Sequence, residues 1–547
     1  MKNLFYCLIT LVLFSCSSEK KAADLIVKNA NIYTVNATFD KGSAFVVNEG
    51  KIIEIGDSET LEAKYSSTNT FDAQGKTIVP GLIDAHAHLY NLGLFLQNVD
   101  LKGTNSFEEV LERVVAFQEE RNLDYIEGRG WDQNDWEVKE FPTKERLDEL
   151  FPDTPVALKR IDGHAYLANS KALELAGITN DTKTEGGEIV LNNGELTGVL
   201  IDSPMNLINV SIPKSSKKHK VQALKAAEKV CLELGLTTVD DAGLDREVIE
   251  LIDSLQQTGE LTIRVYAMVS NTEENLNYYL NNGIVKTDRL NVRSVKVYAD
   301  GALGSRGAAL RKEYSDKENH FGAMITPRYK LSTLAKRIAK AGYQMNTHAI
   351  GDSANISVLR AYKPLINENK DMRWRIEHVQ IITPLDMDYF SKNIIPSVQP
   401  THATSDMYWA EDRVGGERIK GAYAYKSLLK SAGMIALGTD FPIERVNPMH
   451  TFYSATARKD LKNYPEGGYR MEESLSREET LKGMTIWAAY SNFEENEKGS
   501  IEVGKFADFT VLEKDIMTIS EEEIPNLLVN ATFINGDKVY EKGSDLN

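Results

Sequence analysis

Eight short apolar runs that end in polar residues alternate with amphipathic helical stretches along most of this 547-residue chain. Alternation of this kind is typical of repeated βα units around a parallel sheet, and eight strands can close a barrel. The sequence therefore predicts an α/β fold with a TIM-type (β/α)8 barrel. The predicted strands are Ile78–His88, Thr237–Asp241, Arg264–Val269, Val292–Asp300, Gln344–Ala349, Arg373–Val379, Ile394–Gln399 and Met434–Asp440.

Both ends of the chain contain short β-rich runs that are separated by turns. One turn is Asn48-Glu49-Gly50, and the last run is broken at Asn535-Gly536-Asp537. Such spacing is typical of hairpin strands. We therefore expect a small β-sandwich domain that is built from both chain ends, residues 24–76 and 501–547.

The remaining residues divide between the barrel and an insertion. The count of eight strands requires residues 103–215 to be set aside as an insertion after the first strand, which leaves 77–102 and 216–500 for the barrel. The insertion contains its own predicted hairpin, Glu188–Val199, with a turn at Asn192-Asn193-Gly194.

The N-terminus has the features of an export signal. Its apolar run, Leu4–Phe14, is too short to cross a bilayer as a permanent helix, which predicts a signal peptide over residues 1–15. The sequence Leu13-Phe14-Ser15-Cys16 resembles the lipobox of bacterial lipoproteins. That resemblance implies acylation of Cys16 and a place in the bacterial cell envelope, periplasmic or outer-membrane, with membrane contact through the lipid only. The alternative is a plain signal sequence or a short anchor with an incidental cysteine.

The cysteine count limits disulfide formation, and the net charge limits the kinds of binding partner. With Cys7 removed with the signal and Cys16 carrying lipid, Cys231 is the only thiol left, so no disulfide can form within the chain. The formal net charge of −17 argues against a nucleic-acid partner, because phosphate binding needs concentrated Lys and Arg. We expect a small-molecule substrate, and no feature of the sequence indicates an oligomeric state.

Histidines recur where the predicted barrel strands end. His86 and His88 are two residues apart, so they point to the same face of the first strand. Three further strands end in a residue that can also bind a metal ion, namely His348, His378 and Asp440. Because buried polar groups are costly unless they are paired, this set predicts a metal site at the catalytic face of the barrel.

Lys296 lies between Val295 and Val297 in the middle of the fourth predicted strand. Burial lowers the pKa of a lysine, and a neutral amine can add carbon dioxide to become a carbamate that bridges two cations. The alternative is an ion pair with Asp300 or Asp240. With the other ligands present, we favour the carbamate.

Four motifs together resemble the amidohydrolase superfamily, and more closely its amidohydrolase-3 branch, which includes enzymes similar to N-substituted formamide deformylase. The resemblance runs from about residue 24 to residue 540, and its most specific pieces are Val79–His88, Asp300–Ala308, His348–Asp352 and Ser397–His402. It implies a metal-dependent hydrolase that acts on a carbon–nitrogen bond other than a peptide bond.

The resemblance also implies the ligands of two divalent metal ions. One ion would bind His86, His88 and Asp440, the other His348 and His378, and carboxylated Lys296 would bridge them. Zinc suits this mixture of imidazole, carbamate and carboxylate, although iron or manganese would fit similar ligands.

Several residues have possible roles in the reaction. Asp440 could hold a proton of the attacking hydroxide and deliver it to the leaving nitrogen, as a general acid/base. His402 could hydrogen-bond the oxyanion. Arg306 could bind a substrate carboxylate or fix its own loop, and His164 of the insertion could shape the pocket or belong to a purely structural part.

Other functions remain open on the sequence. The same site could cleave an ester, a lactone or a phosphotriester, since fold and ligands do not separate these. A degenerate barrel that captures a ligand as a binding lipoprotein would be expected to lack a metal ligand, and no ligand is missing. A deaminase with one metal ion would have no need for Lys296.

Overall fold

The computed structural model describes residues 20–161, 163–184, 187–212, 216–366 and 371–544. The predicted signal peptide and Cys16 lie outside these residues. The chain divides into two compact units, one of 1–87, 231–244 and 262–547, the other of 88–230 and 245–261. Within the described ranges, no helix combines the length and the apolar character that a membrane crossing requires.

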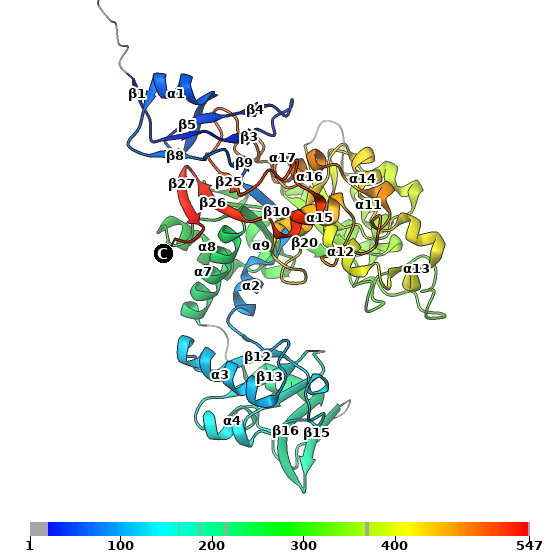
Figure 1. Ribbon diagram of the computed structural model, residues 1–547. Helices are drawn as coiled ribbons and strands as arrows, with labels where there is room; N and C mark the ends of the chain where they lie inside the picture. The colour runs from blue at the N-terminus through cyan, green and yellow to red at the C-terminus, as the bar shows by residue number, and fades with distance from the viewer. Residues whose placement is uncertain (1–19, 162, 185–186, 213–215, 367–370, 545–547) are drawn as a thin grey trace, which may run out of the picture. The chain divides into compact units, whose positions relative to one another are not determined.

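A nearly closed barrel forms the centre of the first unit (Figure 1). Among the described residues its path holds eight strands, and each neighbouring pair along the path is parallel. The gap between the last and first strands is bridged where the Asp440 N–H donates to the His86 carbonyl at 2.7 Å. The predicted α/β barrel is confirmed. In order around the barrel, the strands are β10 (Leu82–Ala87), β17 (Leu236–Leu244), β18 (Arg264–Ser270), β20 (Leu290–Tyr298), β21 (Gln344–Ala349), β22 (Trp374–His378), β23 (Ile394–Val398) and β24 (Ala436–Leu437).

The first and last predicted barrel strands differ from the observed ones. The predicted Ile78–His88 is two strands, because the chain leaves one sheet at Pro80-Gly81 and enters another. β9 (Thr77–Pro80) pairs with β25 (Phe509–Leu512) and belongs to the sandwich. The last strand is only Ala436–Leu437, so most of the predicted Met434–Asp440 is loop.

Helices separate the barrel strands along the sequence. In α8 (Arg246–Gln257), buried Val248, Ile252 and Leu255 recur at helical spacing. A capping box of Ser476 and Glu479 begins α16 (Arg477–Gly483). The others are α7 (Lys217–Glu233), α9 (Glu273–Asn282), α10 (Arg328–Lys340), α11 (Asp352–Tyr362), α12 (Pro400–Asp406), α13 (Ala410–Arg418), α14 (Tyr425–Ala432), α15 (Pro448–Thr456) and α17 (Ile486–Ser491); short β19 (Val285–Lys286) pairs antiparallel with β20.

Alternation along the strands separates the barrel interior from the surrounding helices. On β21, the Thr347 hydroxyl bonds the Tyr362 hydroxyl of α11, so Thr347 faces the helices. His348 contacts the ring of His378 from β22 and therefore faces the interior. Polar residues at every second position of these strands thus point into the barrel, where a core would otherwise be apolar.

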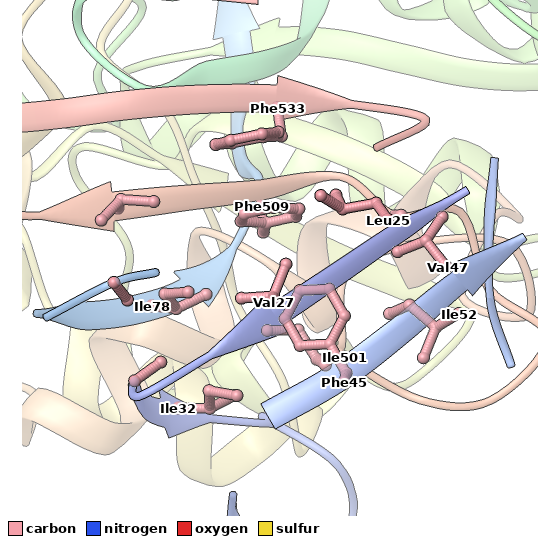
Figure 2. Close-up of a cluster of buried hydrophobic side chains, with 14 of the residues drawn as sticks. Leu25, Val27, Ile32, Phe45, Val47, Ile52, Ile78, Ile501, Phe509 and Phe533 are labelled. Carbon is pink, nitrogen blue, oxygen red and sulfur yellow. The ribbon is translucent and has the colours of Figure 1, made fainter. Parts of the chain in front are cut away.

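The two chain ends build a β-sandwich in the same unit. One sheet is β6-β5-β2-β8 and the other is β27-β26-β25-β9-β3-β4. Phe45 meets Phe509 edge-on, with ring centroids 5.1 Å apart, and Figure 2 shows these and other apolar side chains between the sheets. The predicted sandwich of both chain ends is therefore observed. Its strands are β2 (Leu25–Lys28), β3 (Asn31–Tyr33), β4 (Lys41–Gly42), β5 (Ala44–Asn48), β6 (Lys51–Gly56), β8 (Thr70–Asp72), β26 (Val529–Ile534) and β27 (Asp537–Glu541), with α1 (Ser58–Lys64) and the pair β1 (Lys21–Ala22) and β7 (Tyr65–Ser66) beside them in sequence.

The second unit contains a separate sheet with the order β11-β12-β13-β14-β16-β15. The predicted hairpin is confirmed, because Asn192 pairs with Glu195 across a turn in which Asn193 and Gly194 have φ of 52° and 85°. The elements of this unit are α2 (Leu89–Phe95), β11 (Val99–Asp100), α3 (Phe107–Arg121), β12 (Ile126–Trp131), α4 (Glu145–Leu150), β13 (Val156–Arg160), β14 (Ala165–Ala168), α5 (Ser170–Leu175), β15 (Gly187–Asn192), β16 (Glu195–Asp202) and α6 (Met205–Ser211).

Candidate metal centre

Three imidazole rings meet inside the barrel at the carboxyl ends of β10, β21 and β22. The ring centroid of His378 lies 4.8 Å from that of His86 and 4.5 Å from that of His348. Burial lowers the pKa of His86 to about 4 and that of His348 to about 3, and it lowers the pKa of His378 far below its usual value. All three rings are therefore neutral near pH 7, the form in which imidazole binds metal ions.

Hydrogen bonds fix which ring nitrogens stay available. The Nδ1 of His86 donates to the Glu377 carboxylate at 2.5 Å, and the Nδ1 of His378 donates to the Gln399 side-chain oxygen at 2.8 Å. Each bond leaves Nε2 with a lone pair, as in histidines whose far nitrogen is held by a carboxylate or carbonyl while the near one binds a metal. Among the described residues, the buried Nε2 of His348 has no hydrogen-bond partner.

Asp440 is shared by two groups of side chains that could each hold a metal ion. In the first, ligand atoms of His86, His88 and Asp440 lie within 4.8 Å of one another, and in the second those of His378, His402 and Asp440 do so. His402, which the sequence suggested only for oxyanion binding, is thus also at ligand distance. We call the following residues of the barrel interior the imidazole cluster: His86, His348, His378, His402 and Asp440.

Two members of this cluster have a left-handed backbone. The φ of His378 is 74° and that of Asp440 is 63°. Because of the turn at His378, Glu377 and His378 both reach His86 although they are consecutive residues. Such conformations cost energy in residues other than glycine and are concentrated at functional sites.

Lys296 of β20 points into the same space. Its side chain is buried, and its Nζ lies 2.9 Å from the Nε2 of His86. Burial lowers the pKa of Lys296 to about 8, although the nearby charges of Glu377 and Asp440 oppose the shift. A substantial share of neutral amine is therefore present at mildly alkaline pH.

The ion pairs that offered another explanation of Lys296 are absent among the described residues. Asp240 pairs with Arg375, whose Nη1 lies 2.7 Å from its Oδ2. Asp300 accepts backbone N–H groups of Ile350 at 3.0 Å and of Gly351 at 2.8 Å. Both carboxylates are thus satisfied without the lysine.

Behind the imidazoles lies a second polar group, which we call the arginine cluster: Asp240, Arg375, Glu377 and Ser397. Arg375 donates to Asp240, to Glu377 at 2.8 Å and to Ser397 at 3.1 Å. Burial by itself would raise the pKa of Glu377, but the charges of Arg375 and His86 lower it strongly. Glu377 therefore stays ionised and links the two clusters through His86.

The segment that carries Asp440 is held against β10. Asp84 accepts the Thr439 N–H at 3.0 Å and the Thr439 hydroxyl at 2.6 Å. A Cβ on Gly438 would come within 2.5 Å of the His86 backbone nitrogen, so only glycine allows this approach. Asp84, which precedes the two histidines in their motif, thus positions the segment that carries Asp440.

Asp300, the first residue of the motif Asp300–Ala308, holds the loop after β21. Asp300 accepts the N–H of Gly351 and that of Ala309, each at 2.8 Å. A Cβ on Gly351 would lie 2.1 Å from the Ala309 carbonyl oxygen. These motif residues join the loops after β20 and β21 and thereby fix the strand end that carries His348.

Arg306 and His164, which the sequence suggested for substrate binding, each pair with an aspartate that is not part of the imidazole cluster. Arg306 donates to both oxygens of Asp316, at 3.0 and 2.8 Å, which favours its predicted role in fixing the loop over binding a substrate carboxylate. His164 belongs to the second unit; its side chain is 73% exposed and its Nδ1 lies 2.8 Å from Asp202.

Glu377, Gln399 and Gln380 were not assigned by sequence reasoning. The inward position of Gln399 could have been predicted, since it lies two residues after Ser397 and therefore points to the same face of the strand. Gln380 donates to the Nδ1 of His402 at 3.2 Å, which leaves the proton of that ring on Nε2. Glu377 could not have been placed in this way, because period-two alternation would place either Glu377 or His378 outside the barrel.

Comparison with known proteins assigns this chain to a protein family. A model described as "Amidohydrolase family" matches residues 69–540. Protein LONG AFTER FAR-RED 3 of Arabidopsis thaliana is 32% identical over 538 residues, which cover 95% of this chain and 92% of that protein. N-substituted formamide deformylase of Arthrobacter pascens is 27% identical, with 95% of this chain and 98% of that enzyme covered.

A solved structure shares both the fold and part of the sequence. An uncharacterized metal-dependent hydrolase from Pyrococcus horikoshii OT3 superposes with a TM-score of 0.76 and is 29% identical. The match covers 91% of this chain and 99% of that one. The similarity therefore extends over the barrel and its flanking parts, and not over isolated motifs only.

Proposed function

This chain belongs to the amidohydrolase family, and we propose that it hydrolyses a carbon–nitrogen bond, other than a peptide bond, in a small molecule. The bond would be an amide, an N-formyl or N-acyl group, or a cyclic amide. One observation carries the proposal: neutral imidazoles, a carboxylate and a buried amine converge at the catalytic end of a barrel. The similarity to a formamide deformylase supports the choice of bond.

The donor set fits two divalent metal ions, for which we propose zinc. His86, His88 and Asp440 would hold one ion, His348 and His378 the other, and carboxylated Lys296 would bridge them. The fit rests on the Nε2 atoms of His86 and His378, whose Nδ1 protons are held by Glu377 and Gln399, and on the Nε2 of His348, which has no hydrogen-bond partner among the described residues. When bound, the metal ions would supply the Lewis acid that polarises the scissile carbonyl and acidifies the attacking water.

The chain's own residues would move the protons. Asp440 takes the proton of the attacking water and delivers it to the leaving nitrogen, as the general acid/base of the reaction. The Nε2–H of His402, set by the bond from Gln380, points to the same region, 3.6 Å from Asp440. His402 therefore donates a hydrogen bond to the oxyanion as the carbonyl becomes tetrahedral.

Metal content and a substrate panel test the proposal together. The full-length protein should contain about two zinc ions per chain by elemental analysis, and Lys296→Ala should contain fewer, with partial recovery on addition of a short-chain carboxylic acid. It should hydrolyse N-formyl, N-acyl or cyclic amides faster than matched esters, lactones or phosphotriesters. Preference for the latter group would replace the amide assignment. One metal ion or none, unchanged by Lys296→Ala, would exclude the two-metal site and favour a deaminase or a binding protein.

We also propose that the chain is attached to the bacterial cell envelope through lipid on Cys16. The support is the sequence Leu13-Phe14-Ser15-Cys16 alone. Labelled palmitate should be incorporated into the wild-type chain and not into Cys16→Ser, which should leave the membrane fraction. Equal labelling of the two chains would contradict lipidation at this residue.

A further inference from the structure

Asn346 is a buried amide inside the barrel, and the structure shows no hydrogen bond from its side chain to any described residue. It lies on β21, two residues before His348, and therefore shares the inward face of that ligand. Its side chain is fully buried, and among the described residues neither Oδ1 nor Nδ2 has a hydrogen-bond partner. Burying an amide without hydrogen bonds is energetically costly, so this position calls for a partner that protein atoms alone do not supply.

The neighbours of Asn346 on both sides are cationic side chains. In the parallel register it lies opposite Lys296 of β20 and opposite Arg375 of β22, both buried and pointing inward. The donors of Arg375 are directed to Asp240, Glu377 and Ser397. The amine of Lys296 is directed to His86. Neither cation bonds the amide, although strand neighbours at the same level have Cβ atoms only about 5 Å apart.

The chemistry of the amide indicates which form of Lys296 it suits. A primary amide offers an acceptor oxygen beside N–H donors. An ammonium has donors only, so it could satisfy Oδ1 of Asn346 but would leave Nδ2 unpaired. A carbamate has an N–H beside a carboxylate oxygen, and this edge satisfies both parts of the amide at once.

We propose that Asn346 is the positioning residue for a carboxylated Lys296: its Oδ1 accepts from the carbamate N–H, and its Nδ2 donates to a carbamate oxygen. The inference rests on the carboxylation proposed above. In that step the neutral amine attacks the carbon of carbon dioxide, a nitrogen–carbon bond forms, the electron pair of one C–O π bond moves onto oxygen, and one proton passes from nitrogen to water. The two hydrogen bonds then hold the anionic group toward the imidazole cluster.

Carboxylation can be measured without activity. The zinc-loaded protein is equilibrated with ¹³C-bicarbonate over a range of concentrations, and the carbamate carbon is followed by NMR, with Lys296→Ala as the blank. Loss of two hydrogen bonds, one of them to a charged group, should raise the bicarbonate concentration for half-carboxylation roughly tenfold or more in Asn346→Leu. Zinc content should fall in parallel and recover at high bicarbonate.

Two further variants make the result specific. Thr238→Val, on β17, removes Thr238 Oγ1, which is likewise fully buried and without a hydrogen-bond partner among the described residues, and this variant should carboxylate as wild type does. Asn346→Asp keeps the size but pairs with the Lys296 ammonium, so it should lose the carbamate signal and still fold. Wild-type bicarbonate dependence in Asn346→Leu or in Asn346→Asp would overturn the inference. Absence of a carbamate signal from the wild type itself would instead overturn the proposed carboxylation.

Discussion

The barrel interior holds two polar clusters that differ in how far the protein satisfies them. In the arginine cluster, the guanidinium of Arg375 reaches Asp240, Glu377 and Ser397, and none of these side chains has an unpartnered buried atom among the described residues. In the imidazole cluster, the buried Nε2 atoms of His348 and His402 have no hydrogen-bond partner among the described residues. Because buried polar groups are normally paired, the first cluster is complete in itself and the second requires ligands.

We propose that this difference separates residues that maintain the fold from residues that would take part in the proposed reaction. The two clusters lie in one barrel and are joined at Glu377, which pairs with Arg375 on one side and with His86 on the other. A change in the arginine cluster should therefore act mainly on stability. A change in the imidazole cluster should act mainly on metal binding and catalysis.

The largest loss of activity is expected from a substitution at Asp440. Asp440→Asn keeps the size of the side chain but would remove the proposed general acid/base, a role that contributes about 10²–10⁴-fold in enzymes, and would weaken the proposed metal binding as well. We expect kcat/KM on any substrate that the panel identifies to fall at least about a thousandfold, while the urea midpoint of unfolding changes little.

Asp240→Asn is the matched change in the other cluster, since it also replaces a buried aspartate by its amide. It should lower the unfolding midpoint more than Asp440→Asn does and should leave a measurable activity. If both variants lost activity to the same degree at unchanged stability, the division between the clusters would not hold.

Removal of the cation from the arginine cluster should give the largest loss of stability. Arg375→Met removes the guanidinium that pairs with the buried carboxylates of Asp240 and Glu377, and loss of one partner of a buried ion pair typically costs about 3–5 kcal/mol. Arg337→Met, which breaks a solvent-exposed pair with Glu273, should cost no more than about 1 kcal/mol. Chemical denaturation of the two variants measures the difference, and equal losses would contradict the assignment.

A third buried ionic group, outside the centre, predicts a pH dependence. Burial would raise the pKa of Glu494, but Lys498 and Lys286 lower it to about 2 from its ordinary 4.5. A depressed carboxyl pKa stabilises the fold above pH 4.5, and this contribution is lost as the pH falls toward 2. The difference in unfolding free energy between wild type and Glu494→Gln should thus reach up to about 3 kcal/mol near pH 6 and shrink below pH 4.5. A difference that is constant from pH 6 to pH 3 would exclude this role.

Sequence reasoning recovered the parts of the fold that repeat. The alternation of strands and helices is periodic, and residues at strand ends converge in a barrel, so sequence reasoning placed His86, His348, His378 and Lys296 in one barrel interior, where the structure has them. The break between β9 and β10 was missed, although Pro80-Gly81 is a turn signal. The shortness of β24 was missed because Met434–Leu437 is an apolar run over its whole length, although only Ala436–Leu437 forms the strand.

The rest of the site depends on features that the sequence does not display. Glu377 and His378 both face inward only because His378 takes a positive φ. This conformation is uncommon in residues other than glycine, so it cannot be predicted from the presence of a histidine. Asn346 shares the face of His348 by simple period-two spacing, so its place was predictable. Its significance was not, because the lack of a partner appears only when the neighbouring strands are in place.

The smallest effect is expected at Arg306, outside both clusters. Its bond to both oxygens of Asp316 is partly exposed, with 31% and 21% of the two side chains accessible, so Arg306→Ala should cost no more than about 1 kcal/mol. If Arg306 only fixes its loop, kcat/KM should change by the same small factor for substrates with and without a carboxylate. Asp316→Ala, which removes the contacts of Asp316 with both Arg306 and Arg413, should likewise show no selectivity for or against the carboxylate substrate. A selective loss of the carboxylate substrate in Arg306→Ala alone would instead make Arg306 a substrate-binding residue and extend the catalytic region beyond the barrel interior.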